Sequence, residues 1–167
     1  MLQLLLTRET GAPRRVSPRP QRHLRYHDSL ATIVAKHAAY LKTHQRLAKL
    51  GDAEAVHDMR VAAAHLRAAF RFFAPWIDEG PRKAMNRRLR WLAKALGRAR
   101  EVDIALDRGQ PKGRNNAWRT LRRTRYRQLS RSLSSKQYER LLADLANAAE
   151  RDWMPAERRD ALFARAS

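Results

Sequence analysis

The chain has 167 residues, a length typical of one domain, and 44% of its residues are hydrophobic, too many for a wholly disordered chain. It carries 36 lysines and arginines against 16 aspartates and glutamates, a net charge of +20, and no cysteine. The charge predicts a polyanionic partner, and the lack of cysteine excludes a disulfide framework, a thiolate metal site and a cysteine nucleophile. Arginine accounts for 29 of the 36 basic residues, which favours bidentate contacts with oxyanions.

Residues 1–27 differ in composition from the rest of the chain. They contain Pro13, Pro18 and Pro20, six arginines and a single acidic residue, with no helical periodicity. This pattern predicts a flexible basic N-terminal arm. The apolar run near Met1 is too short for a secretory leader, and no 18-residue apolar stretch exists, so we expect a cytoplasmic protein with no membrane span.

From residue 28 onward, alanine is abundant, β-branched residues are rare, and no sustained alternation of apolar and polar residues predicts a strand. Turn signals divide this region into five predicted helices, at 28–50, 52–76, 81–107, 115–131 and 135–153, with a short helix after Pro155. Short connections between long helices favour antiparallel packing. We therefore predict an all-α fold, an antiparallel helical bundle of about five long helices with a basic groove, at 28–153, followed by a short helix or tail at 154–167.

The predicted helix 52–76 separates its apolar and basic residues into two stripes, if each residue advances about 100° around the axis. The expected core stripe contains Met59, Ala62, Leu66, Phe70, Phe73 and Ile77. The basic stripe contains His57, Arg60, Arg67 and Arg71, with Ala64 at its middle. One basic stripe is by itself an ordinary solvated helix face.

The predicted helix 81–107 repeats this arrangement. Its apolar stripe contains Met85, Leu89, Leu92, Leu96 and Ala99, and its basic stripe contains Lys83, Arg87, Arg90, Lys94 and Arg98. Asp103 falls on the apolar stripe, where an unpaired carboxylate is costly. We expect Asp103 to pair with Arg100 or with an arginine from a neighbouring helix.

The predicted helix 115–131 is the most basic of the five. Trp118, Leu121 and Leu129 mark its packed side, and Arg125 shares that side, so Arg125 should meet an anion or a carboxylate. Basic stripes on three successive helices repel one another, and the acidic residues that would neutralise them are scarce. The three stripes together therefore favour an anion-binding surface over an ordinary solvated one.

Two segments of the chain resemble the signatures of the CHAD family, the histidine-containing α-helical domain. The first is Val56-His57-Asp58-Met59-Arg60-Val61, followed by Leu66-Arg67, and the second is the segment from Leu89 to Asp103. Ser134, Tyr138 and Leu141-Leu142 also resemble a later stretch of the family. The likeness covers residues 28–150 and identifies the chain as a member with a short form of the domain, covering about its first half.

The resemblance implies a helical bundle that binds inorganic polyphosphate through a basic groove, without catalysis. The consequence that we expect of this binding is association with polyphosphate granules, regulation of a partner enzyme or scaffolding. By motif match, the implied ligand residues are His57, Arg60, Arg67, Arg90, Lys94 and Arg100. The full set that we predict adds Arg71, Arg87 and Arg98 from the two stripes, and Arg122 and Arg125 from their position and charge. The family commonly carries two arginines where this chain has Ala64-His65. Family domains also have a second helical half, so we hypothesise that a homodimer rebuilds the full groove.

Three other functions compete with this interpretation. A nucleic-acid (RNA) binding protein is the main alternative, with Trp91, Trp118 and Tyr126 as stacking platforms or, more simply, as packing aromatics. The histidine pairs His23/His27 and His37/His44 lack a completing acidic cluster, so we predict no metal site and no cofactor. Glu101, Asp103 and Asp107 do not form the clustered carboxylates of a Mg²⁺-dependent hydrolase, so we predict no catalytic residues.

Overall fold

The computed structural model describes residues 20–109 and 115–150, with side chains described from Leu30 onward. Within these residues the chain forms five α-helices and one short 3₁₀ helix, η1, and no strand. The helices are α1 (Pro20–Leu50), α2 (Ala53–Phe72), η1 (Ala74–Trp76), α3 (Glu79–Asp107), α4 (Asn115–Leu133) and α5 (Lys136–Glu150). The predicted all-α bundle is confirmed, whereas the predicted groove stays a prediction.

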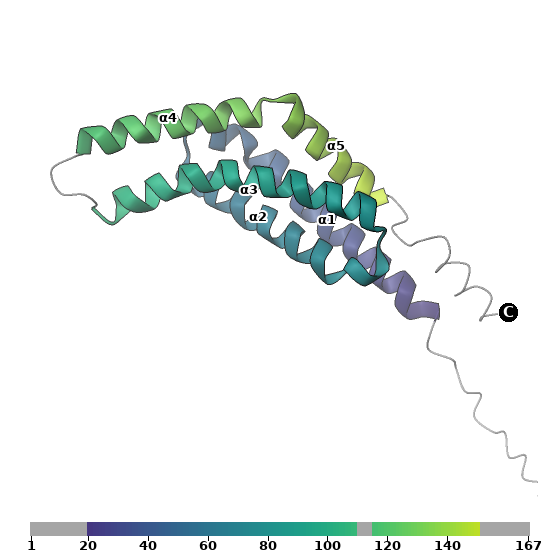
Figure 1. The fold of residues 1–167 in the computed structure, drawn as a ribbon. Coiled ribbons are helices and arrows are strands. Elements are labelled where there is room, and N and C mark those ends of the chain that lie inside the picture. Colours follow the sequence, from purple (N-terminus) through teal and green to yellow (C-terminus); the bar gives the residue numbers. More distant parts are fainter. Residues whose placement is uncertain (1–19, 110–114, 151–167) are drawn as a thin grey trace, which may run out of the picture.

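The first three long helices are successive antiparallel neighbours, and α4 and α5 follow one another along their other side (Figure 1). The chain bends between α4 and α5, close to where both helices contact α1. There Gln45 Nε2 donates to the carbonyl of Leu133 at 2.9 Å, and Tyr138 Oη donates to the carbonyl of Leu41 at 3.1 Å. Helices α4 and α5 thus occupy the fourth position of the bundle together.

The core is built from the apolar stripes that the sequence predicts. All six predicted core residues of α2, η1 and their C-terminal flank are buried, as are all five of α3. The bend between α4 and α5 is anchored by Leu133 and Tyr138, which are fully buried. Burial raises the pKa of Tyr138, because the phenolate would lie in an apolar environment.

The helix boundaries follow local signals with two clear differences. The predicted helix 52–76 ends at Phe72, and Ala74–Trp76 forms the separate helix η1, which has Pro75 in its first turn. Helix α1 begins at Pro20 and not at Asp28, and proline is well suited to the first helical position. Residues 20–27 are therefore helical, and the rest of the predicted arm lies outside the described residues, as do the predicted end at Trp153 and the helix after Pro155. Helix α2 begins next to Asp52, near the predicted start, and Asp52 caps it, since its carboxylate accepts a hydrogen bond from the backbone N–H of Ala55 at 2.7 Å.

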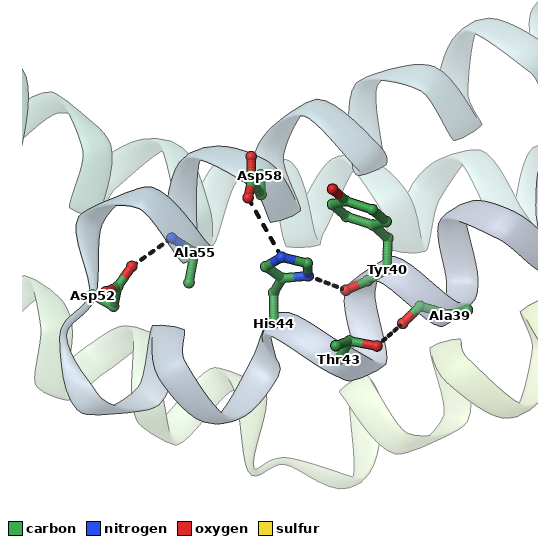
Figure 2. Close-up of polar contacts among 7 residues, drawn as sticks. All are labelled: Ala39, Tyr40, Thr43, His44, Asp52, Ala55 and Asp58. Atoms are coloured by element: carbon green, nitrogen blue, oxygen red, sulfur yellow. Dashed lines mark hydrogen bonds and ion pairs between the residues drawn. The ribbon is translucent and has the colours of Figure 1, made fainter.

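Polar contacts on one side of α1 fix how it packs against α2. His44 Nε2 lies 3.4 Å from a carboxylate oxygen of Asp58, while its Nδ1 lies 2.9 Å from the carbonyl of Tyr40 (Figure 2). About two helical turns away, the ring of His37 on α1 lies 4.9 Å from the ring of His65 on α2. Asp58 and His65 therefore mark the flank of α2 that faces α1.

Candidate polyanion-binding surface

The predicted basic stripe of α2 lies on the flank away from α1. Arg67 is nine positions from Asp58, which places it about 180° around the helix from the residue that contacts α1. Arg60, on the same stripe, is about 140° from His65. Arg60, Arg67 and Arg71 are exposed, and His57 is half-buried. The stripe therefore borders the side of α2 on which α3 packs.

The stripe of α3 is placed by two contacts on the other side of that helix. Arg88 pairs with Asp144 of α5 at 2.5 Å, and Asp103 pairs with α4. Lys94 lies about 180° from Asp103, and Arg90 lies about 160° from Arg88. Both side chains thus point away from α4 and α5 and outward from the bundle, and Arg87 and Arg98 flank them in exposed positions.

We call the combined surface the α2–α3 face. It contains His57, Arg60, Arg67, Arg71, Arg87, Arg90, Lys94 and Arg98. Within residues 30–109 and 116–149, none of these eight side chains forms an ion pair or a side-chain hydrogen bond. Other cations of α3 do have partners: Lys83 and Arg82 lie 2.7 and 3.9 Å from Glu79. Among the described residues, the α2–α3 face therefore has no acidic partner for its positive charge.

Asp103 has the partner from a neighbouring helix that the sequence predicts. It is only 3% exposed, and it accepts hydrogen bonds from Arg122 Nε at 2.7 Å and from Tyr126 Oη at 2.5 Å, both on α4. Arg122 Nη2 also donates to the carbonyl of Gly51 at 2.8 Å, and the guanidinium lies over the Tyr126 ring. This network joins α3, α4 and the turn between α1 and α2.

The network sets the protonation of its members. Partial burial acts to lower the pKa of Arg122, but the hydrogen bond and charge of Asp103 outweigh it, so the pKa is raised and the side chain stays cationic. Burial, followed by the hydrogen bond to Asp103, raises the pKa of Tyr126, which stays a neutral donor. Because two of the donor atoms of Arg122 serve the fold, we leave Arg122 out of the proposed ligand set.

Arg125 and Arg100 have different surroundings from those expected. The buried residues of α4 are Tyr126, Leu129 and Leu133, so Arg122 points inward and Arg125 lies half-buried at the edge, donating to Gln128 at 3.3 Å. Arg125 has no carboxylate partner among the described residues, because the helix is rotated toward Tyr126, and the alternative expectation, that it meets an anion, stays a prediction. Arg100 is half-buried and does not pair with Asp103; its Nε is enclosed with no hydrogen-bond partner among the described residues.

Four of the aromatic and histidine residues considered for other functions contact other parts of the bundle. Trp91 packs against the core, and Tyr126 is buried in the Asp103 network. His44 contacts Asp58, and His37 contacts His65, while the side chains of His23 and His27 lie outside the described part. No group of three or more potential metal ligands occurs in the part of the chain that the structure describes.

Two features of the site were not predicted. Tyr126 and the carbonyl of Gly51 complete the Asp103 network, and the i,i+4 spacing of Arg122 and Tyr126 was the available signal. The second is an outward row of arginines on α4, at positions 119, 123, 127 and 131, whose regular spacing is visible in the sequence.

The fold and this surface define a small helical-bundle domain with an unpaired cationic face. The CHAD domain model matches residues 32–167, and the chain belongs to the CHAD family. Comparisons with curated proteins and with solved structures find no match. None of the described helices is long and apolar enough to cross a membrane.

Proposed function

We propose that the chain binds inorganic polyphosphate on the α2–α3 face, without catalysis, and that this binding brings it to polyphosphate granules in the cytoplasm. CHAD domains are generally non-catalytic binding domains associated with polyphosphate, and the chain belongs to that family. The observation that carries the proposal is the unpaired state of the eight basic side chains on the face.

A linear phosphate polymer fits this surface for an electrostatic reason. Successive basic residues on α2 and α3 are three, four or seven positions apart, so they recur at intervals of about 5 to 10 Å along each helix. Each guanidinium can donate two parallel hydrogen bonds to phosphate oxygens. A polymer of phosphates satisfies many such donors at once and releases counterions as it binds, so the affinity should fall steeply with salt.

Arg100 extends the α2–α3 face at the C-terminal end of α3. Its enclosed Nε lacks a partner, and an unsatisfied buried donor costs free energy that a phosphate oxygen would offset. Arg125 is half-buried on α4, outside the α2–α3 face, and its guanidinium can turn from Gln128 to a ligand. We include both in the proposed ligand set.

The test uses the full chain and a charge-matched pair of variants. Arg60→Glu/Arg67→Glu alters the α2–α3 face, and Lys136→Glu/Arg140→Glu alters exposed cations of α5 by the same charge. Affinity for polyphosphate of defined length is measured by titration at two salt concentrations. We expect the first variant to bind polyphosphate much more weakly than the unaltered chain, and the second to keep an affinity and a salt dependence close to those of the unaltered chain.

Three results would contradict the proposal. Equal losses in the two variants would show that net charge alone determines binding. Full affinity in Arg60→Glu/Arg67→Glu would remove those residues from the site. Preference for single-stranded RNA over polyphosphate at equal charge would favour the nucleic-acid alternative. Light scattering of the same samples checks the predicted homodimer, which stays a prediction.

A further inference from the structure

A second basic surface lies on α4 and α1. It consists of Arg119, Arg123, Arg127 and Arg131 of α4 with Lys42 and Arg46 of α1, and we call it the α4–α1 face. All six side chains are exposed, and none forms an ion pair with a described residue. The four arginines follow one another at i,i+4 intervals, about 6 Å per step and about 18 Å in all.

The inward contacts of α4 show where this row points. Arg122 faces Asp103, and Tyr126 lies beside Gly51 at the end of α1. Viewed along the axis of α4, the four arginines of the row lie between about 60° and 180° from Arg122, in the direction of Tyr126. Arg125 lies about 60° from Arg122 in the opposite direction. The row therefore faces outward on the α1 side of α4.

Lys42 and Arg46 are neighbours of this row across the packed helices. Gln45, between them, reaches the carbonyl of Leu133 on α4. Lys42 and Arg46 lie about 60° and 100° around α1 from Gln45, on its outer side. The contact between α1 and α4 is thus bordered by Lys42 and Arg46 on α1 and by the row of four arginines on α4.

No acidic residue is available to neutralise this face locally. The sequence has no aspartate or glutamate between residues 30 and 50 or between residues 115 and 133. Like charges at i,i+4 spacing destabilise a helix, and α4 carries three such successive pairs. A bound polyanion would remove this repulsion.

The α4–α1 face and the α2–α3 face point in opposite directions. Lys94 of α3 lies about 180° from Asp103, which faces α4, and Arg131 of α4 lies about 180° from Arg122, which faces α3. The bundle core lies between the two faces. We propose that the α4–α1 face is a second polyphosphate-binding surface, so that one chain holds two polyphosphate segments at once and cross-links them. This inference rests on the proposed function of the α2–α3 face.

Cross-linking differs from simple binding in a measurable way. A chain with one face attaches to immobilised polyphosphate but cannot hold a second, soluble molecule. A chain with two faces holds both. Such bridging would gather polyphosphate chains into a condensed phase, since each protein molecule links two polymers and each polymer has room for many proteins.

The experiment is a capture assay with the full chain. Beads carrying long-chain polyphosphate are loaded with equal amounts of bound protein, washed, and exposed to a short fluorescent polyphosphate. The face variant is Arg119→Gln/Arg123→Gln/Arg127→Gln, and the control is Lys36→Gln/Lys136→Gln/Arg140→Gln, which removes the same charge from exposed positions outside both faces. Glutamine keeps a helix propensity close to that of lysine and arginine, so circular dichroism should be unchanged and the thermal midpoint should not fall.

We expect the face variant to bind the beads through the α2–α3 face while its captured fluorescence falls to the level of protein-free beads. The control should capture as much as the unaltered chain. Full capture by the face variant overturns the inference, and would be the result if a dimer bridged through two α2–α3 faces. An unaltered chain that binds the beads without capturing overturns this inference alone, whereas one that does not bind the beads overturns the proposed function as well.

Discussion

Removal of the Asp103 carboxylate tests whether the buried network holds the bundle together. In Asp103→Ala, Arg122 and Tyr126 each lose a hydrogen bond to a charged acceptor. Removing one partner of a buried ion pair costs about 3 to 5 kcal/mol. The lower end applies here, because the Arg122 side chain is 35% exposed and water can solvate it once it is released.

A second effect acts in the opposite direction. Alanine is a better helix former than aspartate by about 0.6 kcal/mol, and position 103 lies within α3. We therefore expect Asp103→Ala to lower the free energy of unfolding by about 2.5 kcal/mol. Asp103→Asn should cost about half as much, because its carbonyl oxygen can still accept from Arg122 and its amide can donate to the Tyr126 hydroxyl.

Urea unfolding followed by circular dichroism measures this loss. With a slope of about 1 to 3 kcal/mol per molar urea for a small protein, the midpoint of Asp103→Ala should fall by about 0.8 to 2.5 M at an unchanged slope. A double-mutant cycle with Tyr126→Phe isolates the pair. The phenylalanine should cost about 1.5 kcal/mol beside Asp103 and close to nothing beside alanine.

Two results would refute this reasoning. A midpoint for Asp103→Ala close to that of the unaltered chain would show that the carboxylate is as costly to bury as its hydrogen bonds are favourable. An equal cost of Tyr126→Phe with and without Asp103 would show that the hydroxyl acts through another contact.

Two further changes address the joints of the bundle. Gly51 has a φ of 97°, in the left-handed region, so Gly51→Ala should lower the free energy of unfolding by about 1 kcal/mol, which the urea midpoint measures. The added Cβ would lie 3.8 Å from the Tyr126 ring, an ordinary contact distance. A much larger loss would therefore contradict backbone strain as the cause. Partial burial, then the charges of His65 and Lys36, lowers the pKa of His37 below 6.5. The unfolded chain therefore takes up this proton first, and stability should fall as pH drops through 6.5 toward the folded-state pKa. The thermal midpoint should drop less between about pH 7.5 and about pH 5.5 in His37→Gln than in the unaltered chain, and an equal drop would exclude His37 as a contributor.

The helices and their core faces could be predicted from residue order alone. The spacing of Met59, Leu66 and Phe70 places them on one side of a helix wherever that helix packs, because each residue turns the backbone by about 100°. The same rule placed Asp103 on the buried side of α3 and required a cationic partner for it. The basic stripes of α2 and α3 are local features of the same kind.

Which residues pair with one another across the helices is decided only by the packed bundle. Whether Asp103 meets Arg100 or Arg122 depends on how α4 is rotated against α3, and that rotation is set by Tyr126, Leu129 and Leu133, which bury themselves against distant parts of the chain. The six cations of α4 look alike in the sequence, yet one serves the fold and four face outward on the side opposite the α2–α3 face. Contacts between helices depend on their relative rotation and register, and a periodicity along one helix carries no information about either.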